Sequence, residues 1–423
     1  MRLLSLHSSL RFLFSLFVVS LFVIPRVFAW QERTTEQQFA VVDSIIQNAI
    51  VRGEIPGAVL LISHGDERVY RKAYGHAQLY DYGMKRLNKP EDMTADHFFD
   101  LASMTKVLAT TMGIMILVNK DFVNLDAPVY RYLPEFRSPS KDSITIRHLL
   151  THSSGLYQWQ PMYLYASEKE GVLKRICDLP LQFPVGQQRR YSDLGFMLLG
   201  YIIEKVSGRL LDQFLKDQLY GPVALRSATF NPLEHGIDKN RIAATSHGNP
   251  YEYHMIADTA FGYRVIGDPD PSIFKRWRHY TLKGEANDGN AFYAHKGIAG
   301  HAGLFSTAED INVLFRLMLH GGTYQGKKIF RKQVVDQFLS RNEFGHGLGW
   351  QLTNLADSVE APVIGFGHGG FTGTYAICIP EHRLVIILLT NRGNMGTNEN
   401  GYYNDLRFLQ RSVFRAILSL VKR

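Results

Sequence analysis

The chain has 423 residues, of which 45% are hydrophobic and 20% are charged. This balance can fill a large core, and it excludes a disordered or a collagen-like protein. Lysine and arginine exceed the acidic residues by a formal charge of +8, but the basic residues are scattered and no zinc-finger or RNP motif accompanies them. We therefore predict no nucleic-acid partner.

Residues 1–29 have the features of a secretory signal peptide. Arg2 and Arg11 precede an apolar stretch over residues 12–24, and Val27 and Ala29 occupy the −3 and −1 positions of a cleavage site. The apolar stretch is shorter than the ~20 residues that a helix needs to cross a membrane. Cleavage after Ala29 is predicted, which would lower the formal charge from +8 to +5 and place the protein in the periplasm or outside the cell. A retained membrane anchor is the alternative.

A helix followed by a β-hairpin is predicted next. Apolar residues at helical spacing run from Phe39 to Ile50, and the pattern stops near Gly53. Two strand-like runs, 58–63 and 69–74, then flank a turn that contains Gly65.

Ser103 and Lys106 form an S-x-x-K motif at the start of an apolar helix that continues over residues 107–118. Residues i and i+3 share a helix face, so Lys106 would stand beside the Ser103 hydroxyl. Burial lowers the proton affinity of a lysine, and a neutral amine could then take the serine proton and create a nucleophile. The helix N-terminus would also stabilise an oxyanion.

Tyr191, Ser192 and Asp193 directly precede a second apolar helix, 194–206, which Gly208 would end. A tyrosine beside a lysine ammonium can act as general base and acid, and the side chain at position 193 can hydrogen-bond a substrate amide. The alternative is that Tyr191 only packs and Asp193 caps the helix. The two apolar helices predict a mostly helical insertion in the middle of the chain.

Neither a metal site nor an α/β-hydrolase fold is expected. His295 and His301 stand beside several glycines, but the chain has no H-E-x-x-H motif and no clustered Cys/His pattern. Loop structure is the better explanation of these histidines. The chain also has no G-x-S-x-G elbow.

The third motif is the glycine-rich segment 367–373, which leads into a strand over residues 374–379. Glycines let a backbone approach a substrate closely, an edge strand can offer N–H groups to an acyl oxygen, and His368 can hold a proton or a carboxylate. Residues 365–370 also match G-x-G-x-x-G, but the strand that follows excludes a dinucleotide site, which needs a helix there. No cofactor is predicted.

The C-terminal end mirrors the N-terminal one, with strands over 374–379 and 384–389 and a helix over 406–420. We therefore predict an α+β fold, in which an antiparallel sheet is flanked by terminal helices and an inserted domain is mostly helical. The expected boundaries within the mature chain, 30–423, are about 36–100 and 300–423 for the sheet part and about 103–299 for the insertion.

Two cysteines, Cys177 and Cys378, are too few for a disulfide framework. Cys378 lies in the apolar run 375–379 and is predicted to be a small buried hydrophobic residue rather than a nucleophile. Whether the two cysteines pair is left open.

The three motifs, in this order and separated by 88 and 177 residues, resemble the serine β-lactamase and penicillin-binding protein superfamily. Its triplet is S-x-x-K, then Y-x-N, then K-T-G or H-x-G. The resemblance extends over nearly the whole mature chain and is closest to the class C β-lactamase-like members, among them the penicillin-binding protein 4B type. It rests on further segments at 132–134, 144–156, 230–233, 242–245, 247–249 and 300–307.

The resemblance implies roles for individual residues. Ser103 would be acylated, Lys106 and Tyr191 would share proton transfer, and the backbone N–H groups of Ser103 and Phe371 would form the oxyanion hole. The residues expected to bind the substrate are Asp193, His368, Gly369 and Gly370.

Two positions depart from the family pattern. Asp193 stands where most relatives have asparagine, so it cannot donate an amide N–H to the substrate. His368 replaces the lysine of K-T-G, which removes a permanent cation from the pocket that would meet a β-lactam or peptide carboxylate. Both departures put β-lactam recognition in question.

The expected function is an exported serine hydrolase that forms an acyl-enzyme, with peptidoglycan D-alanyl peptides as the leading substrate. A β-lactam, an ester or an N-terminal D-residue could be processed by the same machinery. From another class comes a non-catalytic cell-wall binding protein on the same fold, but the intact Ser103, Lys106 and Tyr191 argue against it. A membrane-anchored structural protein would rest on residues 12–24 alone, and the oligomeric state is not predicted.

Overall fold

The computed structural model describes residues 38–258, 263, 268–355 and 362–421. The predicted signal peptide and its cleavage site lie outside these residues.

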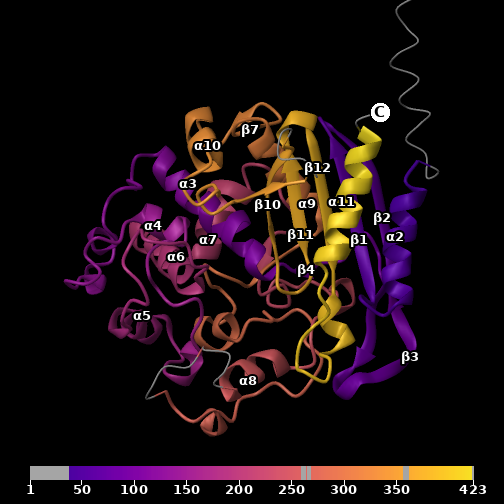
Figure 1. Ribbon diagram of the computed structural model, residues 1–423, viewed down its shortest axis with the longest axis horizontal. Helices are drawn as coiled ribbons and strands as arrows, with labels where there is room; N and C mark the ends of the chain where they lie inside the picture. Colours follow the sequence, from indigo (N-terminus) through magenta and orange to yellow (C-terminus); the bar gives the residue numbers. More distant parts are fainter. Residues whose placement is uncertain (1–37, 259–262, 264–267, 356–361, 422–423) are drawn as a thin grey trace, which may run out of the picture.

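A seven-stranded antiparallel sheet joins the two ends of the chain (Figure 1). In spatial order its strands are β3 (Lys85–Asp92), β2 (Glu67–Asp81), β1 (Gly57–His64), β12 (Leu384–Thr390), β11 (Tyr375–Ile379), β10 (Ile364–Gly369) and β9 (Gln351–Asn354). The register pairs Ala58 with Thr390 and His64 with Leu384, so β1 and β12 lie side by side at the centre of the sheet.

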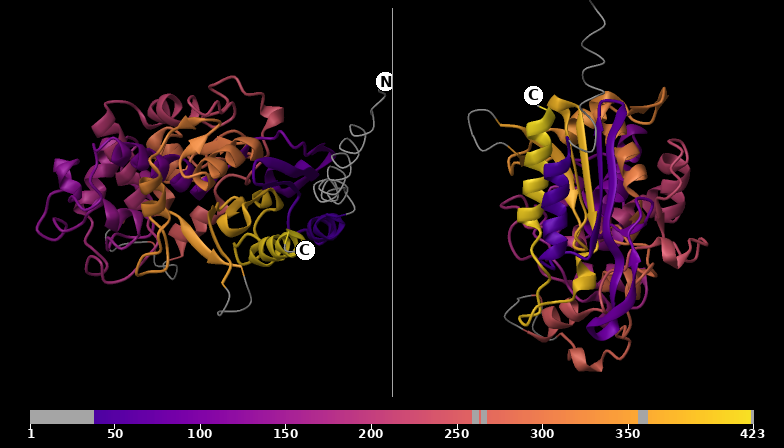
Figure 2. Two further views of the ribbon diagram at one scale, coloured as in Figure 1. Left: turned by 90° about the horizontal axis from the view of Figure 1, so that it is seen from above. Right: turned by 90° about the vertical axis from the view of Figure 1, so that its right-hand side faces the viewer.

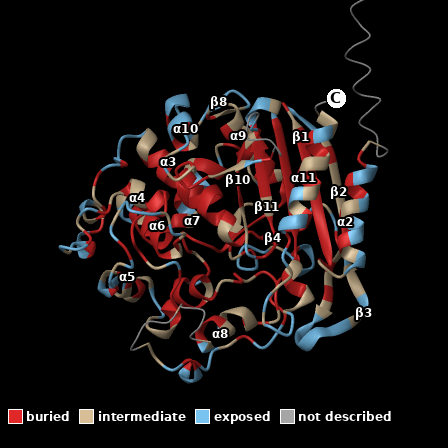
Figure 3. Ribbon diagram, viewed as in Figure 1, coloured by how far each residue is buried: buried red, intermediate tan, exposed pale blue. Residues whose placement is uncertain are grey.

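Helices cover both faces of this sheet (Figure 2). Helices α2 (Ala40–Val51) and α11 (Arg407–Val421) lie together on one face, where Ile386 of β12 packs beneath them. Because side chains alternate along a strand, the neighbouring Ile387 faces the opposite core, which contains α9 (Ala308–Leu319). Strands buried on both faces explain the unbroken apolar run of β12, which Figure 3 shows as buried.

The remaining helices form the other half of the molecule, around the long core helix that ends with α3. They are α3 (Met112–Asn119), α4 (Ile146–Leu150), α5 (Lys169–Asp178), α6 (Asp193–Ser207), α7 (Leu211–Leu215), α8 (Pro250–Ala257) and α10 (Lys332–Leu339). Two small sheets complete the fold, built from β4 (Phe99–Asp100), β6 (Leu304–Ser306) and β5 (Thr229–Phe230), and from β7 (Thr323–Tyr324) and β8 (Lys327–Lys328).

In the described part of the chain, one helical stretch, Ala102–Asn119, is long and apolar enough to cross a membrane. Within it, 83% of the residues are buried inside the protein. This stretch is therefore the core helix of the fold, and it begins at the predicted nucleophile.

The predicted α+β fold, a sheet flanked by terminal helices with a mostly helical part between its strands, is confirmed. Strand β3 was not expected, because its sequence is polar except for Leu87 and Pro90, and a proline is common at a sheet edge. Cys177 and Cys378 are both free thiols, and Cys378 is buried within β11. The residue boundaries of the insertion stay a prediction.

Candidate active site

Ser103 lies where β4 leads into the core helix. The short turn Ala102–Met104 begins this helix, and Ala102 has a φ of 43°, in the left-handed region that costs a non-glycine residue roughly 1 kcal/mol. Asp100 holds the turn, because its two carboxylate oxygens accept hydrogen bonds from Ala102 N at 2.8 Å and Asn287 N at 2.6 Å. The backbone that presents Ser103 is therefore strained and clamped.

Lys106 is fully buried beside Ser103 and has three polar neighbours. Its Nζ donates to Ser103 Oγ at 3.0 Å and to His301 O at 2.8 Å, and it forms an ion pair with Asp193 Oδ1 at 2.7 Å. Burial alone lowers the pKa of Lys106, but the charge of Asp193 and the neighbouring Tyr191 raise it above its ordinary value. Lys106 is therefore an ammonium, and the expectation that burial would leave it neutral is wrong.

Tyr191 lies over Lys106, with its ring centroid 5.0 Å from Nζ, and its hydroxyl contacts both Lys106 and Ser103. Burial raises the pKa of Tyr191, although the nearby Lys106 ammonium opposes the shift. His152 supports the ring from behind at 4.5 Å between centroids, and its Nδ1 accepts a hydrogen bond from Ser192 N. Tyr191 is therefore a protonated phenol in a fixed position.

The cap of α6 is Ser192 rather than Asp193. Ser192 Oγ accepts a hydrogen bond from Gly195 N at 3.2 Å, which is the N-cap geometry. The alternative that Asp193 caps the helix is therefore wrong. Because the cap is supplied by its neighbour, the Asp193 carboxylate can turn towards Lys106.

His368 lies on β10 behind Tyr191, with 6.1 Å between the ring centroids. Only 2% of the residue is exposed, and it is not among the residues that line the pocket at Ser103. Burial, and then the charge of Lys106, lower its pKa to about 3, so the ring is neutral. Its contact with the substrate stays a prediction.

The turn after β10 lies against the backbone that precedes Ser103. A Cβ on Gly370 would be 2.4 Å from Leu101 O, so only glycine allows this approach. Thr372 Oγ1 donates to Asp100 O at 2.6 Å, and Arg392 donates to Phe371 O from both Nε and Nη2. The turn is thus fixed beside the nucleophile. The substrate role of Gly369 and Gly370 stays a prediction, and neither residue is among those that line the pocket at Ser103.

A pocket of about 200 Å³ opens at Ser103, and Phe371 lines it as well. Many of its other lining residues are aromatic or acidic, among them Trp159, Tyr251, Tyr263, Asp193, Glu252 and Asp288. Among the described residues that line it there is no lysine or arginine. Sequence reasoning missed all of these walls except Asp193 and Phe371, because they belong to no motif. The shared lining brings the two predicted oxyanion-hole residues together, although that role stays a prediction.

His301 and His295 are each engaged in the loop structure near this pocket. His301 contacts Asp288 Oδ1 through Nε2 at 2.8 Å, and its carbonyl accepts from Lys106. His295 contacts the Tyr201 hydroxyl at 2.6 Å and Asn290 O at 2.7 Å. The described residues contain no group of three or more side chains placed to hold a metal ion. Only the segment 300–307, quoted for its family resemblance, could have pointed to His301.

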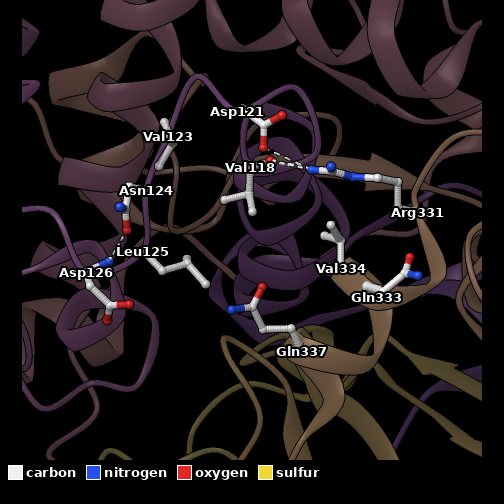
Figure 4. Close-up of a pocket in the computed structure, with 10 residues that line it drawn as sticks. All are labelled: Val118, Asp121, Val123, Asn124, Leu125, Asp126, Arg331, Gln333, Val334 and Gln337. Atoms are coloured by element: carbon white, nitrogen blue, oxygen red, sulfur yellow. Dashed lines mark hydrogen bonds and ion pairs between the residues drawn. The ribbon is translucent and has the colours of Figure 1, made fainter.

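A second hollow, of about 630 Å³, lies at the far end of α3 from Ser103, next to α10 (Figure 4). It holds none of the predicted site residues. Arg331, the cation on its wall, is bound to Asp121 and to Val118 O. This hollow therefore adds nothing to the chemistry at Ser103.

A family model described as Beta-lactamase matches residues 42–409, so the chain belongs to this family, within the serine β-lactamase and penicillin-binding protein superfamily. The predicted recognition is confirmed. The protein is accordingly a serine hydrolase that works through an acyl-enzyme.

Among curated proteins, the chain is 34% identical over 372 residues to an N-acetylmuramyl-L-alanine amidase of Bacillus subtilis (strain 168), which covers 83% of this chain and 80% of that protein. It is also 34% identical over 360 residues to an Escherichia coli (strain K12) protein provisionally named a D-alanyl-D-alanine carboxypeptidase. That alignment covers 80% of this chain and 78% of the relative. Among solved structures, an octameric penicillin-binding protein homologue from Pyrococcus abyssi has a TM-score of 0.65 at 20% identity, which covers 90% of this chain and 77% of that one.

Proposed function

We propose that the protein hydrolyses peptidoglycan-derived peptides in the periplasm or outside the cell, with the D-alanyl peptide bond as its leading substrate. The observation that carries the proposal is the 3.0 Å contact between Ser103 Oγ and Lys106 Nζ at the base of an open pocket. The two curated relatives, whose names refer to peptidoglycan bonds, support the substrate class.

The buried ion pair supports a particular route for the protons. Lys106 Nζ first passes a proton to Asp193, and the neutral amine then takes the Ser103 proton as Oγ bonds to the carbonyl carbon. Tyr191 donates its hydroxyl proton to the leaving nitrogen as the C–N bond breaks. The phenolate then regains a proton from Lys106, which recovers one from Asp193. Water attacks the Ser103 ester through the same groups in reverse.

The nucleophile is tested with a fluorophosphonate probe, which forms a covalent bond with an activated serine. We expect an adduct that mass spectrometry maps to Ser103 and that is abolished in Ser103→Ala. D-Alanine release from a peptide ending in D-Ala-D-Ala then tests the bond that is cleaved. A folded protein that gives neither an adduct nor a product would refute the proposal.

A second candidate is cleavage of the amide between N-acetylmuramic acid and L-alanine. It is favoured by the absence of lysine and arginine from the described pocket lining and by the neutral His368, because a terminal carboxylate would find no cation there. Mass spectrometry of a digested muropeptide separates the two candidates. Free D-alanine supports the first, and a peptide with a free L-alanine amine supports the second. In the second case we also expect fluorophosphonate, but not penicillin, to label Ser103.

A further inference from the structure

His152 is a buried residue beside the active site that the proposed chemistry does not use. It follows α4, and only 4% of it is exposed to solvent. Its φ is 58°, in the left-handed region that few residues other than glycine adopt. A strained backbone of this kind persists only where the surrounding contacts hold it, and such residues are common at functional sites.

The contacts of His152 enclose Tyr191 from both sides along the chain. The carbonyl oxygen of His152 accepts a hydrogen bond from Arg190 N at 2.8 Å, and its Nδ1 accepts one from Ser192 N at 3.0 Å. Its ring lies 4.5 Å from the Tyr191 ring, measured between the centroids. One residue thus contacts the backbone before the tyrosine, the backbone after it and the side chain itself.

Other hydrogen bonds hold the chain where the tyrosine segment leads into α6. Ser192 Oγ donates to Tyr157 O at 2.7 Å. The next residue, Asp193, donates from its backbone N to Gln158 O at 2.8 Å. These bonds anchor the start of the helix, whereas His152 adds an anchor on the preceding side and packs against the phenol ring.

The hydrogen bond from Ser192 requires one protonation state of His152. Because a backbone N–H donates to Nδ1, this nitrogen carries a lone pair, and the proton of the neutral ring lies on Nε2. Burial, and then the charge of Arg189, lower the pKa of His152 well below its usual value. The ring is therefore neutral at neutral pH and remains an acceptor.

We propose that His152 is a positioning residue for Tyr191, and that its acceptor at Nδ1 keeps the Tyr191 hydroxyl where it can donate a proton to the leaving nitrogen. This inference rests on the proposed function, in which Tyr191 supplies that proton. The position of a general acid matters only where the leaving group needs a proton. His152 should therefore affect the cleavage of an amide strongly and the release of an anionic leaving group little.

Two reactions at Ser103 test this distinction. Labelling by the fluorophosphonate releases fluoride, which leaves as an anion, whereas cleavage of a peptide amide needs the proton from Tyr191. The peptide is whichever of the D-alanyl peptide and the muropeptide the wild-type protein cleaves. We expect His152→Gly to lower kcat for peptide hydrolysis about 10²-fold, at the lower end of the contribution of a general acid, and to change the labelling rate by less than about threefold.

His152→Asn separates the acceptor from the ring. Glycine and asparagine both tolerate a positive φ and both remove the imidazole, but only asparagine keeps an acceptor near the position of Nδ1. We expect His152→Asn to be about tenfold or more faster than His152→Gly in peptide hydrolysis, as one restored hydrogen bond would allow.

His148→Gly is the control for a general loss of stability. His148 lies in the same segment, but its Nδ1 accepts a hydrogen bond from Thr145 N at the start of α4. The ratio of peptide hydrolysis to labelling should therefore stay at the wild-type value. An equal fall of both reactions in His152→Gly, or equal activity of its glycine and asparagine variants, would overturn the proposal.

The wild-type protein provides a further test if a variant does not fold. ¹⁵N NMR of the His152 ring should show Nδ1 unprotonated and Nε2 protonated at neutral pH. A proton on Nδ1 would exclude the hydrogen bond from Ser192 N, and with it the proposed role.

A failure of the proposed function is distinguishable from a failure of this inference. If Ser103 is labelled but neither peptide is cleaved, the proposed substrate is wrong, and 3-fluorotyrosine at position 191 then tests the positioning without turnover. Its ¹⁹F resonance should be narrow in the wild type and in His152→Asn, and broad or split in folded His152→Gly. A narrow resonance in all of these proteins would refute the positioning role.

Discussion

Lys106 in the interior of the protein forms an ion pair with Asp193, which lines the pocket, next to the nucleophile. The Asp193 carboxylate compensates for the burial of the Lys106 charge, which would be unfavourable there alone. An asparagine at position 193 would carry no charge and could not stabilise the Lys106 ammonium in this way. The carboxylate sets the protonation state of the residue that must receive the serine proton.

Asp193→Asn should lower the pKa of Lys106, because burial would then act without the opposing carboxylate. Without Asp193 to receive a proton, Lys106 must lose one to solvent before it can act as a general base, so the acylation rate of the variant should rise with pH through the lowered pKa. The asparagine amide should also increase acylation by penicillin. Both are measured as rates of Ser103 labelling from pH 5 to 10, with Asp178→Asn, which removes an exposed ion pair on α5, as control.

The same dependence of labelling rate on pH in Asp193→Asn and in the wild type would show that Asp193 does not control Lys106. An unchanged or lower rate with penicillin would show that position 193 does not limit its recognition.

Strand β10 and its following turn join the nucleophile to the central sheet. The close contact between Gly370 and Leu101 O ties the turn to the segment that carries Ser103. The predicted oxyanion hole would therefore join two elements that are more than 260 residues apart in the sequence. The hydrogen bond from Thr372 to Asp100 spans a similar separation.

Gly370→Ala should reduce acylation strongly while the fold survives. The new Cβ would lie 2.4 Å from Leu101 O and 2.2 Å from Thr374 Oγ1, so the turn must move and carry the Phe371 N–H away from Ser103. Loss of one oxyanion donor costs about 10²–10³-fold in rate. Labelling kinetics check the rate and a thermal melt checks folding.

Gly195→Ala is the matched control for this change, because its Cβ would meet neighbours only at 3.7 Å or more. Equal labelling rates for Gly370→Ala and wild type would contradict the proposed position of the oxyanion hole.

Elements with a strong apolar pattern were predicted from the sequence, and polar or irregular ones were not. The runs that became β1 and β12 are apolar and buried on both faces, whereas β3 is polar. Ser103, Lys106 and Tyr191 were found because they belong to spaced motifs. Glu252 and Trp159 could not be found, because the structure alone brings their segments to the pocket. The charge of Lys106 depends on its distance to Asp193, and a sequence motif does not give this distance.

The sheet with its two terminal helices is the common support of the whole molecule. Helix α11 packs on the sheet face that lies away from α9, so its burial affects stability more than chemistry. Ile417 on this helix is completely buried, while Phe408 on the same helix is 79% exposed. The two positions therefore form a natural pair for a test.

Ile417→Ala should lower the free energy of unfolding by about 2–5 kcal/mol, because it leaves a cavity in a packed core. The rate at which the fluorophosphonate labels Ser103 in the folded protein should be unchanged. Urea unfolding measures the first effect, and Phe408→Ala should leave the unfolding midpoint within the error of the experiment. A large loss of labelling in folded Ile417→Ala would show that this face is coupled to the active site.

The pairing of β1 with β12 also has a consequence for how the protein is made. About 320 residues separate His64 from its partner Leu384. At a synthesis rate of 5–20 residues per second, the apolar strand β1 leaves the ribosome on the order of 20 to 60 s before its central neighbour exists. During that time the edge of β1 that will pair with β12 has no partner and is prone to aggregation. The nascent chain therefore depends on shielding of this strand until nearly all of the protein has been translated.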